Sequence, residues 1–144
     1  PWRTALALAD DGWTLRSAIT WVRKGAIPEP SAKDRPWRQS EFIFVLAKQP
    51  KYFFDRDGLD GEEDVWFIEP DRNSSARGTH YAPYPRDLVR RCIACGCPEQ
   101  GTVLDPFVGG GTTMEVALDM GRHAIGIDIN PEFYELVKDN LSSR

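Results

Sequence analysis

The hydrophobic and polar positions in the first part of the chain predict one helix and two strands. Residues 3–10 are rich in Ala and Leu and are followed by Asp-Gly, which predicts the end of a helix. Residues 13–22 alternate in polarity and carry β-branched and aromatic side chains, and residues 41–47 are almost continuously apolar. Both stretches therefore predict strands. The intervening residues 24–36 contain three prolines, which indicates a loop.

In the second half of the chain, the pattern alternates between helices and strands. Residues 85–95, 112–120 and 131–141 have the spacing of amphipathic helices. The short apolar stretches 102–107 and 123–129 predict strands. Strands that alternate with helices in this way predict an α/β fold with a mostly parallel sheet.

The composition is that of a soluble globular domain with unevenly distributed charge. The 144 residues are 41% hydrophobic and 28% charged, with a net charge of −4. Residues 1–51 carry nine Lys and Arg against five Asp and Glu, whereas residues 52–75 carry two against eight. The basic first third is compatible with a nucleic acid on one face. There is no apolar run of about 18 residues, so we expect no membrane partner.

The cysteines Cys92, Cys95 and Cys97 lie within six residues of one another. An odd number of cysteines at this spacing does not indicate the disulfide framework of a secreted protein. A zinc site would need a fourth ligand, and His80 and His123 are the only histidines. We therefore expect structural thiols, no metal site and a cytoplasmic protein.

The most informative segment is the glycine turn, residues 105–113, which reads Asp-Pro-Phe-Val-Gly-Gly-Gly-Thr-Thr. It joins a predicted strand to a predicted helix, and Asp128 lies at the end of the next predicted strand. This order is typical of a βαβ nucleotide-binding unit. The glycines let a ligand approach the backbone, and the carboxylate of Asp128 can accept both hydroxyls of a ribose. The side chains of Thr112 and Thr113 are expected to cap the helix and to bind a ligand carboxylate.

The residues around this turn favour one nucleotide over others. Thr112 stands where a phosphate-binding loop needs Lys, which argues against ATP and GTP. Met114 stands where a dinucleotide-binding turn usually has its third glycine, which argues against NAD and FAD. S-adenosylmethionine has a carboxylate and a ribose but no pyrophosphate, and so fits the pattern best. The alternative that the glycine turn serves backbone geometry alone, without a ligand, stays open.

These motifs resemble those of the amino-group DNA methyltransferases, which modify adenine N6 or cytosine N4. The resemblance covers essentially the whole chain. It implies a Rossmann-like S-adenosylmethionine-dependent fold and a site-specific methyltransferase for double-stranded DNA, of the restriction–modification type in a bacterium or phage. The stretches that carry it are 15–21 with Lys24, 33–44, 80–85, 105–113 and 126–130.

The order of the motifs resembles the permuted, beta-type arrangement, in which the catalytic half comes first. Residues 80–85 precede the glycine turn, and the resemblance implies that they close over the methionine end of the cofactor. The alternative to a cofactor contact by His80 is that it is an ordinary loop residue. The residues expected to bind the cofactor are His80, Tyr81, Pro83, Asp105, Phe107, Gly109, Gly111, Thr112, Thr113, Asp128 and Asn130.

The catalytic tetrapeptide of this family, Asp/Asn/Ser-Pro-Pro-Tyr/Phe/Trp, does not occur in the sequence. In the family it accepts hydrogen bonds from the target amino group and stacks on the flipped base. We therefore assign no catalytic residue and expect the motif upstream of Pro1, on the same polypeptide or on a second chain. The chain is expected to be a fragment with the middle of its sheet missing, and to be inactive by itself.

Three stretches divide this partial methyltransferase domain. Residues 1–51 are expected to supply late strands of the sheet and a basic loop, residues 52–79 a short insert, and residues 80–144 the cofactor half. The insert lies where the permuted family places its target-recognition region, although its acidity is unfavourable for binding DNA. We expect the basic loop to contact DNA phosphates through Arg23, Lys24, Lys33, Arg35 and Arg38. The alternative is that it is a solvated surface loop.

Two other functions stay open on the sequence. One is a catalytically inactive partner subunit that binds S-adenosylmethionine or DNA. The other is a methyltransferase for RNA or a small molecule. A homodimer also stays open, and the motifs do not distinguish adenine from cytosine.

Overall fold

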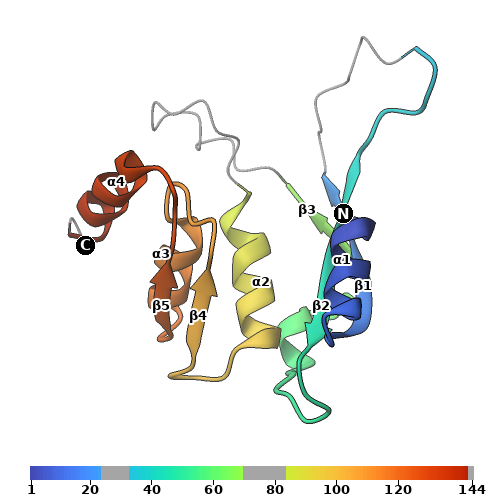
Figure 1. The fold of residues 1–144 in the computed structure, drawn as a ribbon, viewed down its shortest axis with the longest axis horizontal. Helices are drawn as coiled ribbons and strands as arrows, with labels where there is room; N and C mark the ends of the chain where they lie inside the picture. The colour runs from blue at the N-terminus through green and yellow to red at the C-terminus, as the bar shows by residue number, and fades with distance from the viewer. Residues whose placement is uncertain (24–32, 70–83, 143–144) are drawn as a thin grey trace. The chain divides into compact units, whose positions relative to one another are not determined.

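The computed structural model describes residues 1–23, 33–69 and 84–142, which fall into two units. The first unit comprises Pro1–Tyr52 and Gly61–Pro70. The second comprises Phe53–Asp60 and Asp71–Arg144. Figure 1 labels the helices and strands of both units.

The first unit is a three-stranded sheet with the strand order β2-β1-β3. Helix α1 (Trp2–Asp10) precedes β1 (Thr14–Arg23), and β2 (Ser40–Ala47) runs antiparallel to β1. The predicted helix and both predicted strands are confirmed. Strand β3 (Val65–Ile68) is an addition to the prediction and runs parallel to the end of β1. Its four residues are too few for a clear hydrophobic pattern, and β1 stabilises them through long-range pairing.

Two tryptophans form the centre of the first unit. Trp21 of β1 and Trp66 of β3 are register partners, and Trp66 is completely buried. The indole N–H of Trp66 donates to the carbonyl of Glu63 at 3.0 Å, and that of Trp21 donates to the carbonyl of Ile68 at 3.1 Å. Both indoles therefore bury a large apolar surface without leaving a polar group unsatisfied.

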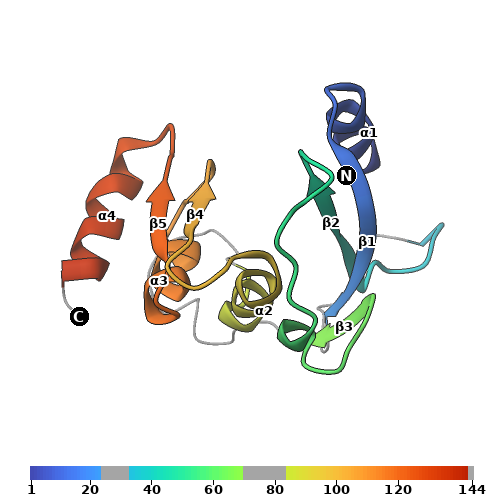
Figure 2. The ribbon, with the colours of Figure 1, turned by 90° about the horizontal axis from the view of Figure 1, so that it is seen from below.

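The second unit is built on two parallel strands, β4 (Thr102–Asp105) and β5 (His123–Gly126). Helix α3 (Thr112–Asp119) connects them, α2 (Arg86–Gly96) precedes them, and α4 (Pro131–Ser142) follows. Figures 1 and 2 show α4 beyond β5, on the side away from β4. All five elements occur where the sequence predicts them, although both strands end two or three residues earlier than predicted.

The core of the second unit lies on one side of this strand pair. Val89 and Ile93 of α2 pack with Val116 and Ala117 of α3, and Val103 and Ala124 of the strands pack against them. On the opposite side, Leu104 is 58% exposed and Ile125 is 53% exposed. The α/β class is confirmed, and the two small sheets are consistent with an incomplete sheet.

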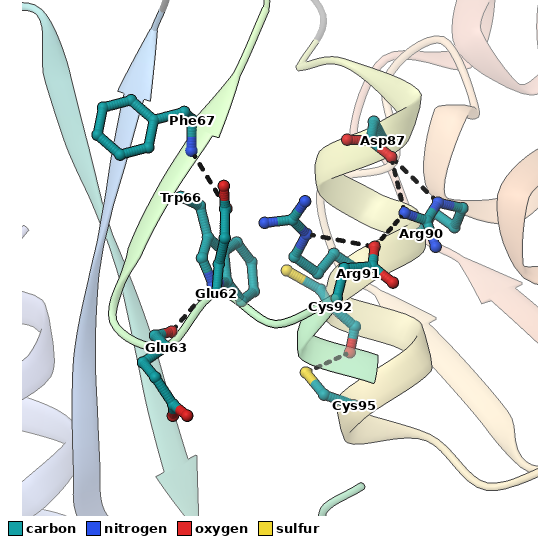
Figure 3. A network of polar contacts seen from close by, with 10 residues as sticks. Glu62, Glu63, Trp66, Phe67, Asp87, Arg90, Arg91, Cys92 and Cys95 are labelled. Carbon is teal, nitrogen blue, oxygen red and sulfur yellow. Dashed lines mark hydrogen bonds and ion pairs between the residues drawn. The ribbon is translucent and has the colours of Figure 1, made fainter. Parts of the chain in front are cut away.

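A turn from the predicted insert packs against α2. The short helix η1 (Asp57–Leu59) brings Gly58 so close to the helix that an added Cβ would lie 2.5 Å from the backbone nitrogen of Cys95. Arg90 of α2 donates to Asp60 at 2.5 Å and to Asp87 at 3.0 Å (Figure 3). Residues 53–60 thus pack with the second unit, whereas residues 61–70 belong to the first, so the predicted insert is divided between the units.

The two cysteines of α2 are free thiols, of which Cys95 is buried and Cys92 is half-buried. Burial raises the pKa of Cys92 to about 12 and also raises the pKa of Cys95. The thiol of Cys95 donates to the carbonyl of Cys92 at 3.5 Å (Figure 3). In the described part of the chain, no group of three His, Cys, Asp or Glu side chains is placed to hold a metal. None of the helices there is long and apolar enough to cross a membrane.

Candidate cofactor-binding site

Backbone hydrogen bonds define the conformation of the glycine turn. The N–H of Ile127 donates to the carbonyl of Asp105 at 2.8 Å, and the N–H of Val108 donates back to Ile127 at 2.9 Å. The chain then passes through Gly109 and Gly111 with φ angles of 48° and 88°. Residues other than glycine rarely adopt this left-handed backbone conformation. The turn therefore needs glycine at these two positions.

The three glycines of the turn face different surroundings. An added Cβ on Gly111 would lie 2.9 Å from a methyl carbon of Val137 in α4. An added Cβ on Gly110 would meet no atom within 4 Å, and one on Gly109 would only reach the carbonyl of Phe107 at 4.0 Å. Gly111 thus lets α4 pack on the turn, while Gly109 and Gly110 leave open space in front of it.

Met114 replaces the third glycine of a dinucleotide-binding turn, and the structure explains why it is tolerated. An added Cβ on Gly126 would lie 2.5 Å from the sulfur of Met114 and 2.8 Å from a methyl carbon of Val108. The space for close helix–strand packing is therefore provided by a glycine on β5 instead of one on α3.

The carboxylate of Asp128 closes the turn. It accepts the N–H of Gly109 at 3.0 Å and the N–H of Asn130 at 2.9 Å. Hydrogen bonds from these backbone groups, first of all from Asn130, lower the pKa of Asp128. The side-chain oxygen of Asn130 in turn accepts the N–H of Glu132 in the first turn of α4. The sequence predicted Asp128 and Asn130 as site residues but gave no sign of these backbone contacts.

The carboxylate of Asp105 is the second acidic group of the site. One of its oxygens accepts the hydroxyl of Tyr84 at 2.9 Å and the hydroxyl of Thr113 at 2.6 Å. Its other oxygen accepts the N–H of Phe107 at 3.0 Å. Burial raises the pKa of Tyr84 to about 12, and the negative charge of Asp105 also contributes, so the hydroxyl stays protonated at neutral pH. Tyr84 was not among the predicted site residues, although it lies within the motif 80–85.

The expectation that Thr112 and Thr113 cap α3 is wrong. The residue at the N-cap position is Gly111, and no side chain caps the helix there. Thr113 lies inside the first turn, where its hydroxyl reaches the carboxylate of Asp105 instead. A side-chain cap requires the hydroxyl one position before the helix, and the left-handed turn places glycine at that position.

An ion-pair clamp, Arg86 with Glu115 and Asp119, joins the start of α2 to α3. The guanidinium of Arg86 contacts Glu115 at 2.5 Å and Asp119 at 2.6 Å. The side chain of Glu115 is only 6% exposed. This clamp was not predicted, and it holds the segment that carries Tyr84 next to Thr113.

The remaining predicted residues are placed as follows. Phe107 is 85% exposed and Ile129 is fully exposed, so two apolar side chains near the turn are uncovered in this chain. His80, Tyr81 and Pro83 lie outside the described residues, as does Lys24 of the basic loop. At the start of that loop, Arg23, the last residue of β1, pairs with Glu41 at 3.3 Å and donates to the carbonyl of Arg38. Arg35 pairs with the adjacent Asp34, and Lys33 and Arg38 are exposed.

Comparison with known proteins identifies the family. The model of the DNA methylase family N6_N4_Mtase matches residues 3–139. The chain belongs to this DNA methylase family. The type II methyltransferase M.XycI of Xanthomonas campestris pv. cyanopsidis is 41% identical to it, over 100% of this chain and 50% of the relative. The resemblance seen in the sequence motifs is thus confirmed.

Solved structures have folds similar to that of this chain. The PvuII DNA methyltransferase, described as cytosine-N4-specific, has a TM-score of 0.82 at 20% identity, over 95% of this chain and 55% of that one. The M1.HpyAVI–SAM complex has a TM-score of 0.75 at 23% identity, over 96% of this chain and 67% of that one. The expected Rossmann-like methyltransferase fold is confirmed. The chain spans about half the length of the curated relatives that it matches first.

Proposed function

We propose that this chain is the S-adenosylmethionine-binding part of a DNA methyltransferase that methylates adenine N6 or cytosine N4. The observation that carries the proposal is the pair of carboxylates at the glycine turn, Asp105 and Asp128, each held by hydrogen bonds from its own surroundings. Membership of the DNA methylase family supports the same reaction. The names of the relatives, all type II methyltransferases, favour an enzyme over an inactive partner subunit.

The acceptor positions of the two carboxylates fit the groups of S-adenosylmethionine. A carboxylate has about four lone-pair positions. Asp128 uses two of them on backbone N–H groups, which leaves about two for the ribose hydroxyls. Asp105 accepts the N–H of Phe107 and one or both hydroxyls of Tyr84 and Thr113, which leaves at least one position for an ammonium N–H. The first N–H groups of α3 have no partner within the helix and suit the ligand carboxylate.

In this proposal, the chain's residues bind and orient the cofactor, which supplies an electrophilic methyl group on its sulfonium. The open space in front of Gly109 and Gly110 admits the ligand close to the backbone. The exposed side chains of Phe107 and Ile129 offer apolar surface for an adenine ring. The M1.HpyAVI–SAM complex, a solved structure with a similar fold, supports the choice of this ligand.

The test is calorimetric titration with S-adenosylhomocysteine. Asp128→Asn keeps the size of the side chain but removes its charge, and we expect binding to weaken roughly tenfold, as for a lost charge-assisted hydrogen bond. Asp139→Asn, at an exposed position of α4, is the matched control and should bind like the wild type. Unchanged affinity of Asp128→Asn, or tighter binding of NAD than of the adenosyl ligand, would exclude the assignment.

The proposal gives DNA contact to the basic loop and leaves target recognition to residues 52–79. Lys33→Ala with Arg35→Ala is expected to weaken DNA binding equally for all sequences. The salt dependence should fall by about one unit per lost phosphate contact. A changed site preference with an unchanged salt slope would show that these residues read bases.

The proposal also assigns the chemistry on the base to residues that this sequence does not contain. No Asp/Asn/Ser-Pro-Pro-Tyr/Phe/Trp stretch occurs in it, so nothing matches the family's acceptor for the target amine. We expect no methyl transfer to mixed-sequence duplex DNA by the 144 residues alone, whereas a polypeptide that also supplies the tetrapeptide should be active. A radiolabel transfer assay decides this, and robust transfer by the chain alone would refute it. The setting we propose is bacterial cytoplasm and a restriction–modification system.

A further inference from the structure

Three oxygen atoms of Tyr84, Thr113 and Asp105 form a small triangle at the site. The hydroxyl of Tyr84 lies 2.6 Å from that of Thr113 and 2.9 Å from one carboxylate oxygen of Asp105. The hydroxyl of Thr113 lies 2.6 Å from the same carboxylate oxygen. Two hydroxyl protons serve these three short contacts. In either arrangement of the protons, the Tyr84 hydroxyl acts on Asp105, directly or through Thr113.

The position of Tyr84 in this triangle depends on packing between helices. Tyr84 lies two residues before the start of α2, whereas Thr113 belongs to α3 and Asp105 ends β4. Two residues after Tyr84, Arg86 contacts Glu115 and Asp119 on α3. The ion pairs of Arg86 thus join α2 to α3, and the hydroxyl of Tyr84 joins the segment just before α2 to the same helix α3.

The triangle occupies one oxygen of Asp105, and the N–H of Phe107 occupies part of the other. We propose that Tyr84 is a positioning residue, which holds Asp105 so that its remaining acceptor position is directed at the ammonium group of the cofactor's amino-acid part. This inference rests on the function proposed above and deepens it. It predicts that the Tyr84 hydroxyl favours ligands that carry this ammonium group over adenosyl ligands that lack it.

The experiment compares two ligands on the wild type and on Tyr84→Phe. S-adenosylhomocysteine carries the amino-acid group, and 5′-methylthioadenosine is the corresponding thioether without it. In Tyr84→Phe we expect binding of S-adenosylhomocysteine to weaken about tenfold, the effect of one lost hydrogen bond to a charged group. Binding of 5′-methylthioadenosine should change by less than about twofold. Tyr134→Phe, which removes a hydroxyl from the exposed Tyr134 on α4, is the control.

The outcomes separate this inference from the proposed function. If the wild type binds neither ligand, the proposed function fails. If the wild type prefers S-adenosylhomocysteine and Tyr84→Phe keeps the same preference, the inference is overturned while the function stands. Equal weakening for both ligands would indicate a structural role for Tyr84 and would also overturn the inference.

A measurement on the wild type keeps the inference testable even if Tyr84→Phe unfolds. With ¹³Cζ-labelled tyrosine, the resonance of Tyr84 should shift when S-adenosylhomocysteine binds and stay near its free position with 5′-methylthioadenosine. Identical shifts with both ligands would contradict the inference.

Discussion

Replacing Gly111 by Ala should destabilise the second unit by a predictable amount, and the adjacent Gly110→Ala is the matched control. Gly111 has a φ of 88°, and an added methyl group would lie 2.9 Å from one methyl carbon of Val137 and 3.3 Å from the other. Gly110 lies outside the left-handed region, and a methyl group there would meet no atom within 4 Å. The two substitutions add the same atoms to the same turn and differ only in conformation and contact.

The expected cost at Gly111 has two parts. Holding a residue with a Cβ in the left-handed region costs about 1–2 kcal/mol. Inserting a methyl group against the buried, β-branched Val137 costs about 1–3 kcal/mol, because neither methyl carbon of Val137 can move away by rotation of a long side chain. We therefore expect Gly111→Ala to lower the free energy of unfolding by roughly 2–5 kcal/mol. Gly110→Ala should change it by about 0.5 kcal/mol or less.

Urea denaturation followed by circular dichroism measures both values. A second probe is the hydrogen exchange of amides in α4, which should become faster in Gly111→Ala because α4 packs on the turn through Val137. Equal losses of stability in the two variants would refute this prediction, because the expected difference comes entirely from the φ angle of Gly111 and from its contact with Val137. A loss of stability in Gly111→Ala without faster amide exchange in α4 would mean that only the left-handed conformation, and not the contact with Val137, contributes to the cost.

Three further predictions concern other parts of the second unit. Arg86→Met takes the guanidinium away from the buried carboxylate of Glu115 and should lower the free energy of unfolding by about 3 kcal/mol. Lys138→Met breaks an exposed 3.8 Å pair and should lower it by at most about 0.5 kcal/mol. Similar values for the two variants in urea denaturation would contradict this prediction. Because folding lowers the pKa of Asp128 below 3.8, its stabilising effect is present above that pH and is lost as the pH falls through the folded value. The difference in melting temperature between the wild type and Asp128→Asn should therefore shrink from pH 7 to about pH 3, and a constant difference would argue against the backbone contacts of Asp128. Burial raises the pKa of Cys92 to about 12, so iodoacetamide at pH 8 should modify Cys92 slowly in the folded protein and rapidly in urea. Mass spectrometry can follow both rates, and equal rates would mean that the thiol is not buried.

The sequence predicted most of the fold because its elements have strong local signals. The βαβ unit around α3 is marked by apolar strands on either side of a glycine turn, and the predicted positions hold in the structure. Strand β3 could not be predicted in the same way. Its four residues gain their strand conformation from pairing with residues 20–23 of β1, more than 40 positions earlier in the chain.

The site was predicted in part. Motif spacing predicted Asp105 and Asp128 as candidate site residues, because a carboxylate at the end of each predicted strand is visible in the sequence. The partners of these carboxylates were not visible, since they depend on helix packing. Tyr84 reaches Asp105 from the segment before α2, a helix that Arg86 joins to α3. Thr113 was misread as a cap because spacing does not tell which acceptor a hydroxyl reaches.

The division of the chain between its two units has a consequence for how the protein can be dissected. The second unit begins with residues 53–60, and the chain then returns to the first unit for β3 before it enters α2. A cut before Phe53 would take β3 away from β1, and a cut after Pro70 would take η1 away from α2. No single cut leaves both units whole, because each unit is made of two segments that are separated in the chain. Point substitutions are the means by which the contribution of each unit can be measured separately.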